Sequence, residues 1–119
     1  MVIAVDFDGT CVDHRYPDIG PDAPGCVSKL LTFVAMGHHI ILFTMRSGQH
    51  LTPAVDWFAQ RGIPLFGVNV NPEQHTWTDS PKAYAHLYID DAAYGCPLTT
   101  SGGFKRSVVD WAKIDLEGF

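Results

Sequence analysis

MVIAVDFDGT, residues 1–10, contains the transition that decides the fold, because an apolar run gives way there to two carboxylates. Residues 1–5 are uncharged and rich in β-branched side chains, which is typical of a parallel strand buried on both faces. Asp6 and Asp8 follow directly, and their spacing of two lets both side chains lean toward one side as the strand ends. The stretch predicts a buried first strand that delivers two carboxylates to one edge of a sheet.

Strands and helices are expected to alternate along the rest of the chain. Further apolar runs predict strands at 39–43, 64–70 and 87–89. Apolar residues three and four apart predict helices over 27–34, 51–58 and 104–112, and Asp79-Ser80-Pro81 predicts the start of a short helix. Residues 11–25, with three prolines and two glycines, are expected to form an irregular excursion. This alternation implies an α/β fold with a doubly wound, Rossmann-like parallel sheet and helices on both faces.

The composition is that of one globular domain. With 119 residues, of which 46% are apolar and 18% charged, the chain suits a single domain over 1–119 that needs no disulfide or structural metal. Its three cysteines form no C-x-x-C pair, and no segment has the pattern of a signal peptide or a membrane span. We therefore expect a reducing, cytoplasmic location. The net charge of −5 argues against nucleic acid as a partner.

Three of the expected strands end in residues that carry chemistry. Asp6 and Asp8 follow the first strand, and the second and fourth strands are followed by Thr44, Arg46, Asp90 and Asp91. Parallel sheets of this class bind ligands at the carboxyl ends of their strands. These side chains are therefore expected to converge on one edge and to form the functional site.

The four carboxylates of this edge require a counter-charge. At an effective dielectric constant of 20, two carboxylates 4 Å apart repel by about 4 kcal/mol, which a divalent cation relieves. Oxygen ligands favour Mg²⁺ over Zn²⁺, and the six histidines show no H-x-x-x-H spacing. A calcium loop of the EF-hand type does not fit, because positions 6 and 12 counted from Asp6 hold Cys11 and Pro17. The sequence thus predicts Mg²⁺ as cofactor.

Three residues are candidates for binding a phosphate group. The Thr44 hydroxyl can donate to a non-bridging oxygen, the Lys82 ammonium can offset negative charge, and Arg46 is a further cationic candidate. Nucleotide-binding loops of the types G-x-x-x-x-G-K-[ST] and G-x-G-x-x-G are absent. The nucleophile motif G-x-S-x-G is absent as well, so a serine nucleophile has no support.

The order of these motifs resembles that of the haloacid dehalogenase (HAD) superfamily of phosphotransferases. The family's four motifs correspond here to D-F-D-G-T at 6–10, I-I-L-F-T at 40–44, Lys82 and Y-I-D-D at 88–91. The resemblance implies that Asp6 is the nucleophile and forms an aspartyl-phosphate. It implies that Asp8 protonates the leaving oxygen and then activates water. The implied Mg²⁺ ligands are Asp6, the backbone carbonyl of Asp8, Asp91, and Asp90 either directly or through water.

Members of this superfamily often carry an inserted cap domain, for which this chain has no room. Only 33 residues lie between Thr10 and Thr44, and the stretch after the third strand is shorter still. The site is therefore expected to be covered by residues 11–25, by a second subunit of a homo-oligomer, or by a large substrate. Within residues 11–25, which we call the flap, Arg15 and Tyr16 are candidates for contacting the substrate.

The expected function is Mg²⁺-dependent hydrolysis of a phosphate monoester, with a small phosphorylated molecule as substrate. Two alternatives stay open: a non-catalytic module of the same fold that binds phosphate and Mg²⁺, and a 5′- or 3′-nucleotide phosphatase as the specific subtype. A response-regulator receiver domain also uses an aspartyl-phosphate. Its phosphorylated Asp, however, follows the third strand, where this chain has V-N-V-N at 68–71.

Overall fold

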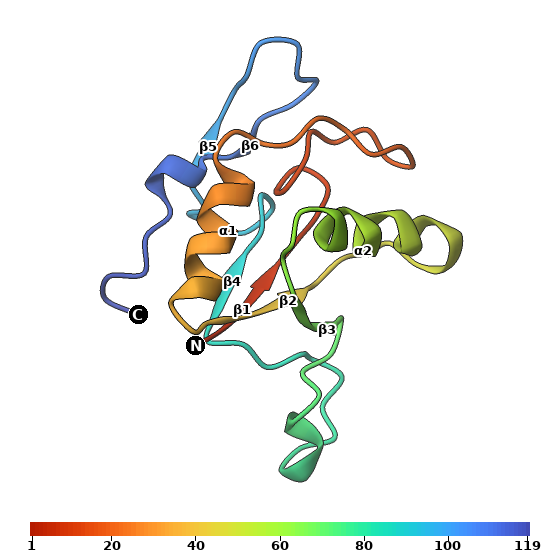
Figure 1. Ribbon diagram of the computed structural model, residues 1–119, viewed down its shortest axis with the longest axis vertical. Coiled ribbons are helices and arrows are strands. Elements are labelled where there is room, and N and C mark those ends of the chain that lie inside the picture. Colours follow the sequence, from red (N-terminus) through yellow and green to blue (C-terminus); the bar gives the residue numbers. More distant parts are fainter.

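Four parallel strands form the centre of the molecule (Figure 1). The computed structural model describes residues 1–119. Its strands are β1 (Val2–Val5), β2 (His39–Leu42), β3 (Leu65–Val68) and β4 (Leu87–Ile89), paired in the order β3-β2-β1-β4. All four strands expected from the apolar runs are therefore present in one α/β domain. β1 takes a central position with a neighbour on each side, as its almost fully buried residues require.

The register of the sheet brings the ends of three strands level. Val5, the last residue of β1, pairs with Leu42 of β2 and with Ile89 of β4. The next residue, Asp6, donates its backbone N–H to the carbonyl of Ile89 at 2.9 Å. The chain segments that follow these three strands therefore leave the sheet side by side at its carboxyl edge.

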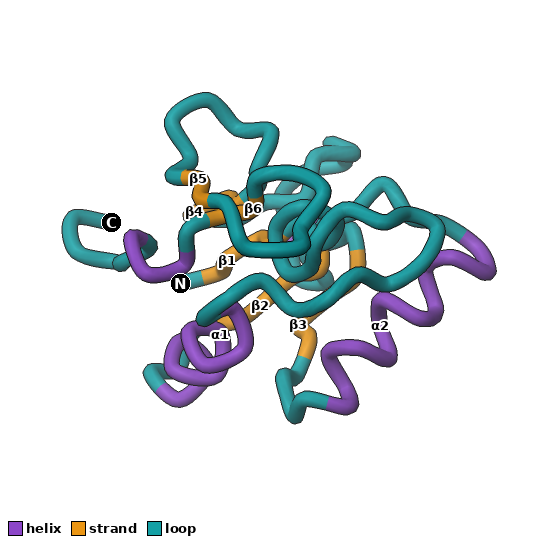
Figure 2. Tube along the Cα trace, turned by 90° about the horizontal axis from the view of Figure 1, so that it is seen from above, coloured by secondary structure: helices purple, strands orange, loops and turns teal.

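Two helices, α1 (Cys26–Ala35) and α2 (Leu51–Gln60), pack on the same face of the sheet (Figure 2). Each presents one apolar stripe, so Leu30 and Phe33 of α1 and Ala54 and Phe58 of α2 are buried. They share one core with the alternate residues of β1 and β2 that point to this face. Burial of each large apolar side chain there contributes about 1.5–3 kcal/mol to the free energy of folding. Neither helix, nor any other, has the length and apolar character needed to cross a membrane.

The opposite face of the sheet carries no α-helix, which differs from the expected helices on both faces. Its core is small and consists of Ala4, Ile41 and Ala85, flanked by partly buried apolar side chains. Ala85 belongs to the connection between β3 and β4, whose only helical turn is the 3₁₀ turn η2 (Gln74–Thr76). The short helix expected after residues 79–81 does not form.

The side chain of Gln74 explains why this connection stays irregular. Its Nε2 donates to the carbonyls of Ser80 at 3.2 Å and Lys82 at 2.9 Å, and its Oε1 accepts from the N–H of Tyr84 at 2.7 Å. Backbone groups that a helix would pair internally thus have side-chain partners instead.

The prediction of a helix over 104–112 is also wrong. This part of the chain forms the antiparallel pair β5 (Leu98–Thr99) and β6 (Val108–Val109), followed by the 3₁₀ turn η3 (Trp111–Lys113). Adjacent β-branched residues favour a strand, and both valines of β6 are fully buried. The N–H of Val109 donates to the Gly9 carbonyl at 3.2 Å, and the indole of Trp111 donates to the Thr10 carbonyl at 2.8 Å. The segment therefore supports the loop that follows β1.

Candidate functional site

Three carboxylates meet at the carboxyl edge of the sheet. Asp6 follows β1, and Asp90 and Asp91 follow β4, which pairs with β1. One oxygen of each carboxylate lies within 4.8 Å of an oxygen of the other two. The structure thus brings together three of the four carboxylates that the sequence placed at this edge, and we call them the carboxylate cluster.

Gly9 and Thr10 shape the loop that holds the carboxylate cluster. Gly9 has a φ of +84°, and a Cβ on it would lie 2.5 Å from Oδ2 of Asp91, so both the backbone conformation and the space require glycine. The buried Thr10 hydroxyl lies 3.1 Å from Asp6 Oδ2 and 3.2 Å from Asp91 Oδ1, and it accepts the N–H of Asp91 at 3.1 Å. Sequence analysis quoted Thr10 in a motif but missed this role, which links the ends of β1 and β4.

The carboxylate cluster has no basic partner. None of the ion pairs of the molecule includes Asp6, Asp90 or Asp91. Burial, together with the negative charge of Asp90 and the contact with Asp91, raises the pKa of Asp6 to about 8 from an ordinary value of 3.8. Near neutral pH the site therefore favours a proton or another cation beside Asp6.

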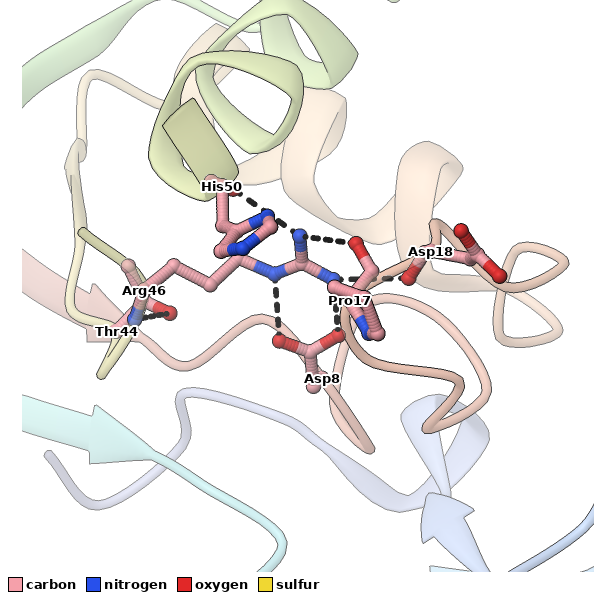
Figure 3. Close-up of polar contacts among 6 residues, drawn as sticks. All are labelled: Asp8, Pro17, Asp18, Thr44, Arg46 and His50. Carbon is pink, nitrogen blue, oxygen red and sulfur yellow. Dashed lines mark hydrogen bonds and ion pairs between the residues drawn. The ribbon is translucent and has the colours of Figure 1, made fainter. Parts of the chain in front are cut away.

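Asp8 lies outside the carboxylate cluster and pairs with Arg46. The guanidinium binds the carboxylate at both ends: Nε lies 2.7 Å from Oδ2 and Nη2 lies 2.7 Å from Oδ1 (Figure 3). The side chain of Arg46 is 1% exposed, and its remaining N–H groups bond to backbone carbonyls. No N–H of the Arg46 side chain is therefore free for a phosphate oxygen, and its phosphate role stays a prediction that requires one of these bonds to break.

Thr44 lies at the site as expected. It lines a cavity of about 340 Å³ together with Asp6 and Asp8. Its N–H donates to Oδ1 of Asn69 at 2.8 Å, and its hydroxyl oxygen accepts the N–H of Arg46 at 3.1 Å, which leaves the hydroxyl hydrogen available for a ligand. Asn69 has a φ of +58°. Its hydrogen bond to Thr44 was not predicted from the sequence.

Lys82 makes no contact with the carboxylate cluster. Its Nζ lies 5.3 Å from the centre of the Tyr88 ring, and it belongs to no ion pair. Lys82 is exposed and does not line the cavity that contains Asp6. Its role as a phosphate ligand stays a prediction, and it requires the flexible side chain to move away from Tyr88.

The flap contributes Tyr16 to the cavity but not Arg15. Tyr16 lines the cavity beside His14, whose two ring nitrogens have no hydrogen-bond partner, and beside the exposed Met45. Arg15 instead pairs with buried Asp13 at 2.9 Å and donates to the carbonyl of Gly103 at 3.0 Å. Of the two flap candidates, only Tyr16 is therefore placed to touch a ligand. Sequence analysis missed Met45, since it belongs to no recognisable motif.

Comparison with known proteins places the chain beside one solved structure. A scan of protein-family models finds no match, and a search of curated proteins finds none either. The solved structure of a conserved protein from Bacteroides thetaiotaomicron is 43% identical in sequence, covering 80% of this chain and 78% of that chain, with a TM-score of 0.73. An identity of this size over most of both chains shows common descent, and the chain belongs to the same family as this conserved Bacteroides thetaiotaomicron protein.

Proposed function

We propose that this protein is a Mg²⁺-dependent phosphate-monoester hydrolase, a capless member of the HAD superfamily that acts through an aspartyl-phosphate. The observation that carries the proposal is the carboxylate cluster: three carboxylate oxygens lie within 4.8 Å of one another, without a basic partner, beside an open cavity of about 340 Å³. Half-buried carboxylates so close together repel one another, which a divalent cation would relieve, and an oxygen-only donor set suits Mg²⁺.

The residues present fit the proposed metal. Asp6, Asp90 and Asp91 would hold Mg²⁺ through their carboxylates, with the backbone carbonyl of Asp8 as a further ligand. Burial and the neighbouring carboxylates of Asp90 and Asp91 raise the pKa of Asp6, and a divalent cation held by the three carboxylates would offset this repulsion. When bound, the metal neutralises charge on the phosphoryl group.

The chain's own residues supply the remaining chemistry. An Asp6 oxygen forms a bond to phosphorus while the bond between phosphorus and the leaving oxygen breaks. Asp8 in its protonated form gives that oxygen its proton and becomes the carboxylate that pairs with Arg46. Water, activated by Asp8, then attacks phosphorus and restores the Asp6 carboxylate. The Thr44 hydroxyl, whose hydrogen is free, donates a hydrogen bond to a phosphoryl oxygen. Lys82 completes the phosphate contacts once its side chain moves toward the cavity.

The architecture supports the same proposal. Strand order β3-β2-β1-β4 with a site at the carboxyl edge is compatible with a Rossmann-like sheet in which β1 carries the nucleophile. The connections hold no inserted domain, so a small phosphorylated molecule reaches the cavity past the flap. The three cysteines are free, which is in keeping with a reducing, cytoplasmic location.

Hydrolysis of 4-nitrophenyl phosphate by the purified protein tests the proposal. We expect turnover with Mg²⁺, none with EDTA, and none for Asp6→Asn, which removes the nucleophile with little change of shape. Asp56→Asn, at an exposed position of α2, is the matched control and should keep the wild-type rate. Turnover that survives EDTA, or an active Asp6→Asn variant, would contradict the proposal.

A second candidate is a non-catalytic module that binds Mg²⁺ and phosphate. One observation favours it: neither basic candidate is available to bind a phosphate. All N–H groups of the Arg46 side chain already have hydrogen-bond acceptors, and Lys82 lies over the Tyr88 ring. Calorimetric titration with Mg²⁺ and inorganic phosphate separates the two. Binding without turnover of any phosphate ester would favour the module, whereas turnover would favour the hydrolase.

A further inference from the structure

Arg46 has no unused hydrogen-bond donor. Its Nη1 donates to the carbonyls of Pro17 at 3.1 Å and His50 at 3.0 Å, and its Nη2 donates to the carbonyl of Asp18 at 2.9 Å. With the two bonds to Asp8, all five N–H groups of the guanidinium are engaged (Figure 3).

Two aromatic rings also lie close to the guanidinium. Its central carbon lies 5.2 Å from the centre of the Phe7 ring and 5.1 Å from that of Tyr16. Phe7 is fully buried, and Tyr16 belongs to the flap. Hydrogen bonds in the guanidinium plane and ring contacts together hold one orientation of the side chain.

The contacts of Arg46 join three separate segments of the chain. Asp8 belongs to the loop after β1, Pro17 and Asp18 belong to the flap, and His50 immediately precedes α2. Because one rigid group binds all three, the direction of the Asp8 carboxylate and the seat of the flap are set together.

We infer that Arg46 is a positioning residue that orients Asp8 toward the leaving oxygen and seats the flap over the cavity. The inference rests on the proposed function, in which Asp8 transfers the proton. It replaces the expectation that Arg46 binds the phosphate. Lysine in its place keeps the charge but cannot hold both oxygens of Asp8 and three carbonyls, so Asp8 loses its fixed direction.

The leaving group of the substrate separates this role from a general structural one. 4-Nitrophenolate is a weak base that leaves without a proton, whereas an alkoxide leaves only when a group such as Asp8 protonates it. For Arg46→Lys we expect kcat for glycerol phosphate to fall by at least about tenfold more than kcat for 4-nitrophenyl phosphate. KM for 4-nitrophenyl phosphate should change little, because Arg46 does not touch the phosphate.

The chain contains a matched control. Arg61 also binds both oxygens of a carboxylate, at 3.0 and 2.9 Å, donates to a carbonyl and stacks on Trp57. Its carboxylate partner is Asp22, at the far end of the flap, and neither residue lines the cavity that contains Asp6 and Asp8. Arg61→Lys should leave the ratio of the two kcat values at its wild-type value. Equal losses on both substrates for Arg46→Lys, or a gain with glycerol phosphate, would overturn the inference. Absence of wild-type turnover on both would instead reject the proposed function.

A measurement without turnover covers the case in which Arg46→Lys does not fold. In Asp8→Asn, amide hydrogen exchange of residues 13–22 should speed up at least about tenfold, because the bonds that seat the flap depend on Arg46 held by Asp8. The Nε–H resonance of Arg46 should shift, while that of Arg61 stays in place. Unchanged flap exchange together with an unchanged Arg46 resonance would overturn the inference.

Discussion

Asp6 is one of three neighbouring carboxylates that have no basic partner, and its protonation is expected to affect the stability of the protein. In metal-free protein its pKa is about 8, against 3.8 for an ordinary aspartate. Between about pH 4 and about pH 8 the unfolded chain has lost this proton while the folded protein keeps it. The free energy of unfolding should therefore fall as pH rises through this window and level off above it.

Urea denaturation of the metal-free protein across this window measures the effect. Asp6→Asn should remove most of the slope, and Mg²⁺ added at the high end should restore stability by replacing the lost proton. A slope that is the same in Asp6→Asn as in the wild type would assign the pH dependence to other groups.

Gly9 gives a second prediction at a single residue. Gly9→Ala should cost about 1–2 kcal/mol for the left-handed backbone, and it should also push Asp91 out of the carboxylate cluster, where a Cβ would meet its Oδ2. Gly95 has the same φ of +84° but open space around it, so Gly95→Ala should pay only the backbone cost. Calorimetry should show weaker Mg²⁺ binding for Gly9→Ala alone. Equal Mg²⁺ affinity in both variants would show that Gly9 does not shape the metal site.

The flap is the element expected to select the substrate, and its two candidates differ in direction. Tyr16→Ala should lower kcat/KM for a phosphate ester with a large leaving group several-fold more than for 4-nitrophenyl phosphate, because Tyr16 lines the cavity. Arg15→Ala should leave kcat/KM unchanged for both substrates, since the Arg15 side chain binds Asp13 and the carbonyl of Gly103. If Arg15→Ala instead lowered kcat/KM for the large substrate more than Tyr16→Ala does, the flap would have to change conformation when substrate binds.

Elements could be predicted where the apolar pattern and the tertiary contacts agree. The four strands follow from apolar runs and both helices from periodicity, because most of the apolar residues so selected are buried or pack against the core. Leu31 of α1 is an exception and is exposed. The final helix was wrong because residues 104, 108, 111 and 112 mimic a helical stripe, although Val108 and Val109 are both buried in a strand pair. The short helix after residue 81 failed because Gln74 binds the backbone there, a contact that no local pattern reveals.

At the scale of the whole molecule, the site depends on segments that lie far apart in the sequence. Strand order and register place Asp6 beside Asp90 and Asp91, which motif order anticipated. Which base pairs with which acid was not predictable, since Arg46 and Lys82 both carry a positive charge and no local pattern assigns either one an acidic partner. The structure separates them by burial, because only Arg46 reaches five acceptors while remaining almost inaccessible to water.

The most direct test of the central claim, that Asp6 is a nucleophile that carries the phosphoryl group, is to trap it. The protein is quenched with acid during turnover of 4-nitrophenyl phosphate with Mg²⁺, reduced with borohydride, which converts an acyl phosphate to homoserine, and sequenced by mass spectrometry. We predict homoserine at position 6, and more of it in Asp8→Asn, in which breakdown of the intermediate is slow. Turnover with an unmodified Asp6, or homoserine at Asp90 or Asp91 in its place, would contradict the account.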